Sequence, residues 1–206
     1  MTKTMILTSP SVPPLEWPSL KDDAARLTWF RAVIEAYADL WAGHVSMPTL
    51  TPATQEAVTE AENRLGCVLP ADLRRYHLEV GTLDLAEQLC ALDKAARTPM
   101  LPLFDAYPGL AERGLAKQEE ALAEQLIVFG DYLGNGNMFC FHRSTGAVYY
   151  FDHDTDPALT FFASDIDRYL EALMIKMLAE VHEQEAAGED LLVERFGRAL
   201  VRKWLY

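Results

Sequence analysis

The residues best suited to do chemistry follow a short aromatic run near position 150. Asp152, His153, Asp154 and Asp156 bring three carboxylates and an imidazole together, and such oxygens and nitrogens are metal ligands. Successive strand residues point to opposite faces, so Asp152 and His153 converge only if the chain turns there. The segment also lacks the glycine and distal glutamate of an EF-hand loop. The sequence therefore favours a solvated strand end whose aspartates cap a turn, with no metal.

A histidine on the preceding segment belongs to the same group of candidates. His142 is predicted to pair across a hairpin with residues near Asp152, or to be a polar residue on an open face. The chain has no G-x-S-x-G motif, and His182-Glu183 is not followed by the second histidine of a zinc protease motif. Nothing here calls for an enzyme or a cofactor, although a metal-dependent hydrolase using His142, His153 and the nearby aspartates remains an alternative.

Glycines punctuate the segment just before these residues. Gly130, Gly134 and Gly136 stand where a positive φ or a close backbone approach costs little. A strand pattern follows them, without the lysine of a P-loop or the helix of a dinucleotide-binding fold. The glycines therefore predict a wide turn between two strands and no nucleotide site.

Aromatic residues dominate the two predicted strands around the turn at residues 143–146. Period-two alternation should bury one set and leave the other open as a protein-binding face bordered by aspartates. The alternative is a hairpin with both faces covered by helices. The residues concerned are Tyr132, Phe139, Phe141, Tyr149, Tyr150 and Phe151.

The net charge of the chain indicates which classes of partner it can attract. A formal net charge of −13 repels phosphate backbones, which disfavours nucleic acid as a partner. The same charge attracts a basic protein. The alternative explanation of the charge is that it serves solubility alone. No run approaches the roughly 20 apolar residues of a membrane span. The first residues show no signal-peptide pattern, and three scattered cysteines suit a reducing compartment. We expect a soluble cytoplasmic protein without membrane contact.

The elements that must position the candidate residues follow from periodicity and caps. An extended proline-containing arm should precede a helix that begins with a capping box at Ser19. A second capping box at residues 164–167 should begin another helix. The remaining predictions are helices at 51–65, 70–80 and 115–124, weaker helical turns around Leu85, Leu89 and Leu92, strands at 126–129, 138–142, 147–151 and 159–162, and a final helix after Gly188. This order predicts an α+β fold with N-terminal helices, an antiparallel meander around a central hairpin, and C-terminal helices packed on the sheet.

Several segments, taken in order, resemble the SUKH superfamily, whose members include bacterial immunity proteins and a fungal cell-wall regulator. They are residues 62–70 (ENRLGCVLP), 72–77 (DLRRYH), 127–131 (IVFGD), 134–135 (GN), 139–141 (FCF), 145–153 (TGAVYYFDH), 162–164 (FAS) and 169–170 (YL). The resemblance implies an α+β domain at 51–182 without catalytic residues, which neutralises a toxin by stoichiometric binding; such toxins are frequently nucleases. An arm and extra helix at 1–50 and a C-terminal amphipathic helix at 183–206 lie outside this domain.

The sequence thus predicts a partner-binding surface for a cognate basic toxin. A regulatory module for an endogenous cytosolic partner is the alternative, and the terminal helices could be packing additions, a homodimer surface or part of the partner site. Replacing Asp152 or Asp154 by lysine should weaken binding without unfolding the protein. The candidate partner-binding residues are Asp131, Tyr132, Asn135, Asn137, His142, Asp152, His153, Asp154 and Asp156.

Overall fold

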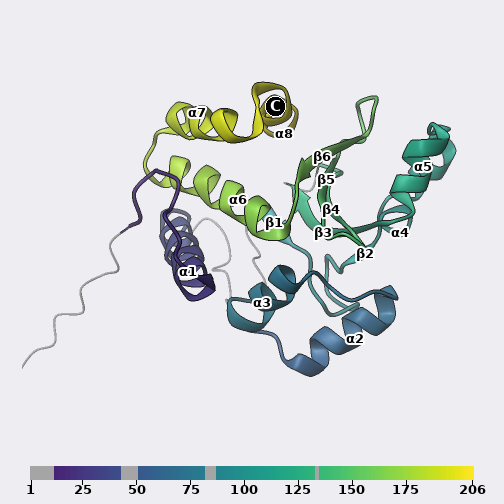
Figure 1. Ribbon diagram of the computed structural model, residues 1–206, viewed down its shortest axis with the longest axis horizontal. Helices are drawn as coiled ribbons and strands as arrows, with labels where there is room; N and C mark the ends of the chain where they lie inside the picture. The colour runs from purple at the N-terminus through teal and green to yellow at the C-terminus, as the bar shows by residue number, and fades with distance from the viewer. Residues whose placement is uncertain (1–11, 43–50, 82–86, 133–134) are drawn as a thin grey trace, which may run out of the picture.

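The computed structural model describes residues 12–42, 51–81, 87–132 and 135–206 (Figure 1). It confirms the predicted α+β class, with helices before and after an antiparallel sheet. The helices are α1 Asp23–Leu40, α2 Gln55–Leu65, α3 Ala71–Glu79, α4 Leu103–Ala106, the 3₁₀ helix η1 Pro108–Arg113, α5 Lys117–Ala123, α6 Ile166–Val181, α7 Glu185–Phe196 and α8 Arg198–Leu205. The strands are β1 Glu87–Leu89, β2 Leu101–Pro102, β3 Leu126–Tyr132, β4 Asn137–His142, β5 Val148–Phe151 and β6 Leu159–Ala163.

The sheet follows the order β1-β3-β4-β5-β6, and β2 also pairs with β3. Strands β4 and β5 form the predicted central hairpin, with Phe141 opposite Val148 and Met138 opposite Phe151. Strand β6 pairs with β5 alone within the described part of the sheet, so its other side is an edge.

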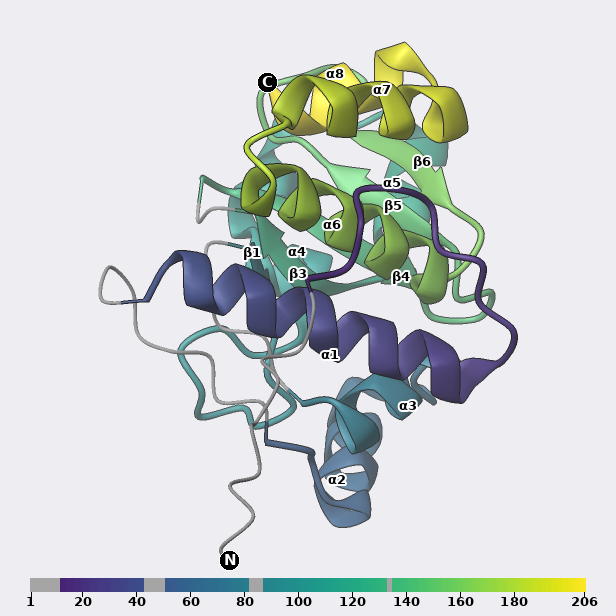
Figure 2. The ribbon, with the colours of Figure 1, turned by 90° about the vertical axis from the view of Figure 1, so that its left-hand side faces the viewer.

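Helices lie on both faces of the sheet. Figure 1 shows α6, with α7 and α8 beyond it, on one side of the strands, and α4 and α5 on the other. Figure 2 shows α1 running alongside α6, on the side opposite α7, and α1 and α6 contact each other. Across the described residues no helix has both the length and the apolar character needed to cross a membrane.

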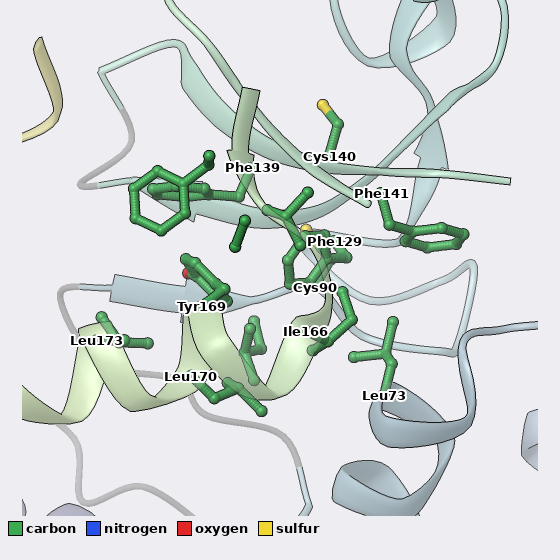
Figure 3. Close-up of a cluster of buried hydrophobic side chains, with 14 of the residues drawn as sticks. Leu73, Cys90, Phe129, Phe139, Cys140, Phe141, Ile166, Tyr169, Leu170 and Leu173 are labelled. Atoms are coloured by element: carbon green, nitrogen blue, oxygen red, sulfur yellow. The ribbon is translucent and has the colours of Figure 1, made fainter. Parts of the chain in front are cut away.

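Part of the core forms where Ile166, Tyr169 and Leu170 of α6 face the aromatic side chains of β3 and β4 (Figure 3). Leu192 of α7 and Trp204 of α8 are buried in the same core. The Phe139 ring lies 4.4 Å from Tyr169 and 5.7 Å from Trp204, measured between ring centroids. Phe139 and Tyr150 are buried on this face of the sheet, and Phe151, which points to the other face, is buried against Tyr107 of the α4–η1 junction. The alternative in which both faces of the hairpin are covered is therefore the one observed.

The other aromatic residues of the predicted face are buried, half-buried or outside the described residues. Phe141 is buried and Tyr149 is half-buried, while the side chain of Tyr132 lies outside the described residues. Of the two arrangements that the sequence left open, the covered hairpin is present, because the helices that follow η1 and β6 return to opposite sides of the same strands.

Local caps decide where the two long helices begin. The carboxylate of Asp22, and not the hydroxyl of Ser19, accepts the Ala25 N–H at the start of α1 (2.8 Å). The carboxylate of Asp165 accepts the Arg168 N–H at the start of α6 (2.9 Å). Both capping boxes predicted a helix in the right place, but aspartate is the cap in each case.

Two further predictions need correction. The segment around Leu89 is strand β1, paired with β3, where weak helical turns were predicted; Leu85 lies outside the described residues. The last helix begins at Glu185, before Gly188, and Gly197 divides it into α7 and α8. The positive φ of 83° at Gly197 explains the break, because only glycine adopts it at little cost.

The described part of the predicted proline-containing arm has neither helix nor strand and passes across α6 (Figure 2). The indole Nε1–H of Trp17 donates to the Leu191 carbonyl (3.2 Å), and the ring of His182 is hydrogen-bonded to the Pro13 carbonyl (2.8 Å). The guanidinium of Arg195 lies 4.3 Å from the centroid of the Trp17 ring. The arm therefore fastens α7 to the rest of the domain.

Helices α6 and α7 pack closely at Gly188, where an added Cβ would lie 2.3 Å from the Cβ of Ala179. We expect Gly188→Ala to lower the free energy of unfolding by about 1–2 kcal/mol, because overpacking outweighs the gain in helix propensity. Urea unfolding followed by tryptophan fluorescence measures the change.

Ala179 provides the matched control for this contact. In the double variant with Ala179→Gly, the nearest remaining neighbour of a Cβ at position 188 is the Ala179 Cα, at 3.6 Å. The double-mutant cycle should therefore show a favourable coupling of about 1 kcal/mol or more. Additive effects of the two substitutions would contradict the close packing.

Candidate protein-binding site

The chain turns immediately after β5, at Asp152. The Asp152 N–H donates to the Ala158 carbonyl (2.9 Å), and the carboxylate of Asp152 accepts the Asp154 N–H (3.0 Å). Asp152 is only 6% exposed. The aspartate thus caps a turn as predicted, but its placement on the exposed binding surface needs correction, because the carboxylate faces inward to hold the loop of residues 152–158.

A hydrogen-bond network joins this loop to the turn before β4. The amide oxygen of Asn137 accepts from the His153 N–H (3.1 Å) and is bonded to the ring Nδ1 of His153 (2.9 Å). The amide group of Asn137 also donates to the Tyr150 hydroxyl (3.0 Å). Asn135 accepts the Asn137 N–H (2.9 Å). Residues from two segments of the sequence-predicted site therefore come together at one end of the sheet.

Gly136 allows this close approach. Its φ is +94°, and an added Cβ would lie 3.1 Å from the His153 ring. A residue with a side chain would be strained there and would also press on the imidazole. Gly136 of the predicted glycine turn thus lies directly against the His153 ring.

His142 lies at the opposite end of β4. Its N–H donates to the Ala147 carbonyl (2.8 Å), and its ring lies 3.2 Å from the Ser144 hydroxyl, measured from Nδ1 to Oγ. The predicted pairing of His142 with residues near Asp152 is wrong, because the hairpin register places Asn137, not His142, next to that end of β5. His142 therefore does not belong to the same surface.

The exposed groups of the site are fewer than the sequence indicated. The side chain of Asp154 is 80% exposed, and Asp156 and Asn135 are exposed, whereas the His153 side chain is 24% exposed. The backbones of Asp131 and Tyr132 lie beside Met138 and Asn137 at the same end of the sheet, but their side chains lie outside the described residues. We use "acidic loop surface" for Asn135, Asn137, His153, Asp154 and Asp156.

Three residues distant in sequence fasten the 152–158 loop. Arg113 of η1 donates to the carbonyls of His153 and Thr155 (2.6 Å each). Glu119 of α5 accepts the Leu159 N–H (3.0 Å). Lys203 of α8 donates to the Pro157 carbonyl and the Thr160 hydroxyl (2.8 Å each).

Lys203 is half-buried against the loop, and this position affects its pKa. Burial lowers its pKa, and the nearby carboxylates of Asp152 and Glu119 act in the opposite direction. No motif in the sequence signals Arg113, Glu119 or Lys203, since each meets the loop only through the tertiary fold.

The metal-ligating atoms of this cluster do converge. One atom each from Asp152, His153 and Asp154 lies within 4.8 Å of the others, because the chain turns where strand alternation would have separated them. The contacts already present account for the cluster: Asp152 holds the Asp154 N–H, His153 holds Asn137, and the His153 Nε2 lies 3.3 Å from the Asp154 carboxylate. The arrangement is that of a hydrogen-bonded loop.

A serine and a histidine side chain meet in the turn that follows β4. The His142 Nδ1 lies 3.2 Å from the Ser144 hydroxyl, two residues away in an exposed turn. No carboxylate hydrogen-bonds to the His142 ring among the described residues to orient it, as a catalytic triad requires. The contact is that of a turn.

The fold and the site define an α+β domain whose sheet is enclosed by helices and which presents acidic loops at one end. The chain belongs to the SMI1 / KNR4 family (SUKH-1), whose family model matches residues 52–172. This confirms the resemblance to the SUKH superfamily, which includes immunity proteins. No curated protein matched the chain when the two were compared. The matched region begins before α2 and ends within α6, so α1, α7 and α8 lie outside it.

Proposed function

We propose that this protein is a non-enzymatic, immunity-type protein that neutralises a cognate basic toxin by stoichiometric binding through the acidic loop surface. The observation that carries the proposal is the presentation of Asp154 and Asp156 on a loop that Arg113, Glu119 and Lys203 hold in place. The SUKH family, which includes immunity proteins, supports the same function.

The geometry suits binding because the main chain of the loop is already ordered. Arg113 and Lys203 bond to three loop carbonyls, at His153, Thr155 and Pro157. A loop that is ordered before binding loses less conformational entropy when the partner arrives. Its exposed carboxylates remain available to a basic partner, and the net charge of −13 would steer such a partner toward the protein.

The polar groups beneath the exposed carboxylates have a supporting role in this proposal. Asn137 and His153 bond to each other and to main chain, and Asp152 caps the turn. They hold the exposed groups in position and leave Asp154, Asp156 and Asn135 as the contacts for a partner. Binding, not reaction, is the function that such groups support.

Charge reversal on the loop tests the proposal. In cells that express the toxin encoded by the neighbouring gene, the natural protein should restore growth. The variant Asp154→Lys with Asp156→Lys should associate with the purified toxin about tenfold to a hundredfold more slowly, with a weaker dependence on salt. Surface plasmon resonance at several salt concentrations measures the rate.

A matched variant separates the loop from the overall charge. Glu56 and Glu60 are exposed on α2, so Glu56→Lys with Glu60→Lys changes the net charge equally without touching the loop. An equal loss of binding in both variants would assign the effect to net charge alone. Continued cell death despite well-folded natural protein would refute toxin neutralisation, and affinity capture of a housekeeping protein from the native cell would favour a regulatory module.

A further inference from the structure

A second concave surface lies beside the edge strand β6. It runs between β6 and the junction of α7 and α8, with a volume of about 860 Å³. The rings of Phe162 and Phe196 stack beneath it, with centroids 5.2 Å apart. Phe161 is 55% exposed on the strand itself. The groove therefore combines an apolar floor with a free strand edge.

The charge of this groove is opposite to that of the whole protein. Its lining contains Arg168, Arg195, Arg198 and Lys203, against Asp156 as its acidic residue, whereas the chain has 31 acidic and 18 basic residues. A local positive surface on a strongly acidic protein is not explained by solubility.

Two of the four basic side chains are available to a partner. Lys203 already bonds to the 152–158 loop, and Arg195 lies over the Trp17 ring and 3.6 Å from Glu171. Arg198 is exposed and forms no ion pair with any residue that the structure describes. Arg168, whose side chain is 57% exposed, lies 4.0 Å from Asp165, a contact that contributes little at such exposure.

The main chain of β6 offers hydrogen bonds on the same side. Because Asp152 donates to Ala158, alternation of the antiparallel ladder turns the N–H groups of Leu159 and Phe161 away from β5. The Leu159 N–H does point outward, since it donates to Glu119. Phe161 therefore presents its N–H and carbonyl at the open edge, where a polypeptide can bond to them.

We propose that this groove docks an extended acidic segment of a partner protein, with its carboxylates on Arg168 and Arg198 and its main chain beside Phe161. A second copy of the chain is disfavoured, because a two-fold contact through β6 would bring the same arginines face to face. Nucleic acid is disfavoured by the net charge of −13 and by the strand edge, which matches a polypeptide. The groove meets the acidic loop surface at Asp156, but the proposed contacts, Arg168, Arg198 and the main chain of Phe161, do not belong to that surface.

Fluorescence anisotropy tests the proposal with a fluorescein-labelled peptide that alternates glutamate with valine. The full-length protein should bind this peptide, and not a peptide of equal length that alternates lysine with valine. Arg198→Glu should weaken binding by about tenfold, because it replaces an attraction with a repulsion. The amide resonance of Phe161 should shift when the peptide is added to isotopically labelled protein.

Arg202→Glu is the matched control, since Arg202 is exposed on the same helix and does not line the groove. It should change the affinity by less than about twofold, with the charge of the protein altered equally. Equal effects of the two variants, absence of acidic-peptide binding, or preference for labelled single-stranded DNA would overturn the proposal. A dimer in sedimentation experiments that Arg198→Glu dissociates would also overturn it, in favour of a second copy.

Discussion

Asp152→Lys is expected to lower the free energy of unfolding by about 3 kcal/mol, whereas Asp154→Lys should change it by less than about 0.5 kcal/mol. The two positions are two residues apart, but Asp152 is 6% exposed and the Asp154 side chain is 80% exposed. Lysine at position 152 would remove the acceptor of the Asp154 N–H. It would also place an ammonium group near Lys203, which now interacts favourably with the Asp152 carboxylate.

Asp152→Asn separates the two causes. Asparagine keeps an oxygen that can cap the turn but removes the charge, so the loss should stay below about 1 kcal/mol. Urea unfolding of the three variants gives the comparison. Equal stability of Asp152→Lys and Asp154→Lys would show that Asp152 does not hold the loop. Asp152 would then again be a candidate residue of the binding surface.

The stability of the protein should also fall in weak acid because of His77. The ring of His77 is fully buried in α3, and neither ring nitrogen has a hydrogen-bond partner among the residues that the structure describes. Burial lowers its pKa from 6.5 to about 4. Between these values the unfolded chain takes up a proton that the folded protein does not, so stability falls as the pH falls from 6.5 to 4. The loss should reach about 3 kcal/mol and then level off, since below pH 4 both states hold the proton.

His77→Leu should remove this part of the pH dependence and should not lower stability at pH 7. It replaces a buried polar ring, which has no hydrogen-bond partner in the described part of the chain, by an apolar side chain. His142→Leu is the control, because His142 is only half-buried. Urea midpoints measured from pH 7 to pH 4 provide the test. If His77→Leu and the natural protein lose stability in parallel, His77 is not the group responsible.

The predictions from sequence succeeded where the cause is local. Helix α2 ends at Leu65 as predicted, because Gly66 follows it with a φ of 66°, and the predicted turn at residues 143–146 closes the hairpin. Each feature depends on residues a few positions apart. Strand β1 was missed because its three residues take their structure from pairing with β3, about 40 positions away.

The site was predicted in part for the same reason. The hairpin register is set by the turn at residues 143–146, and counting from that turn places His142 beside Ala147 and Asn137 near Asp152. The positions of His142 and Asn137 could therefore have been predicted from the sequence alone. The burial of Asp152 and the contacts from Arg113, Glu119 and Lys203 could not, because they depend on how η1, α5 and α8 fold back onto the sheet.

The bond from Lys203 to the Pro157 carbonyl joins a helix outside the family match to a loop inside it. The matched residues 52–172 therefore contain the acidic loop surface but not all of the residues that hold its loop in place. Moving this loop into another protein with its shape intact would therefore require α8 as well. The shape of a loop inside the family domain thus depends on a helix that the family match does not include.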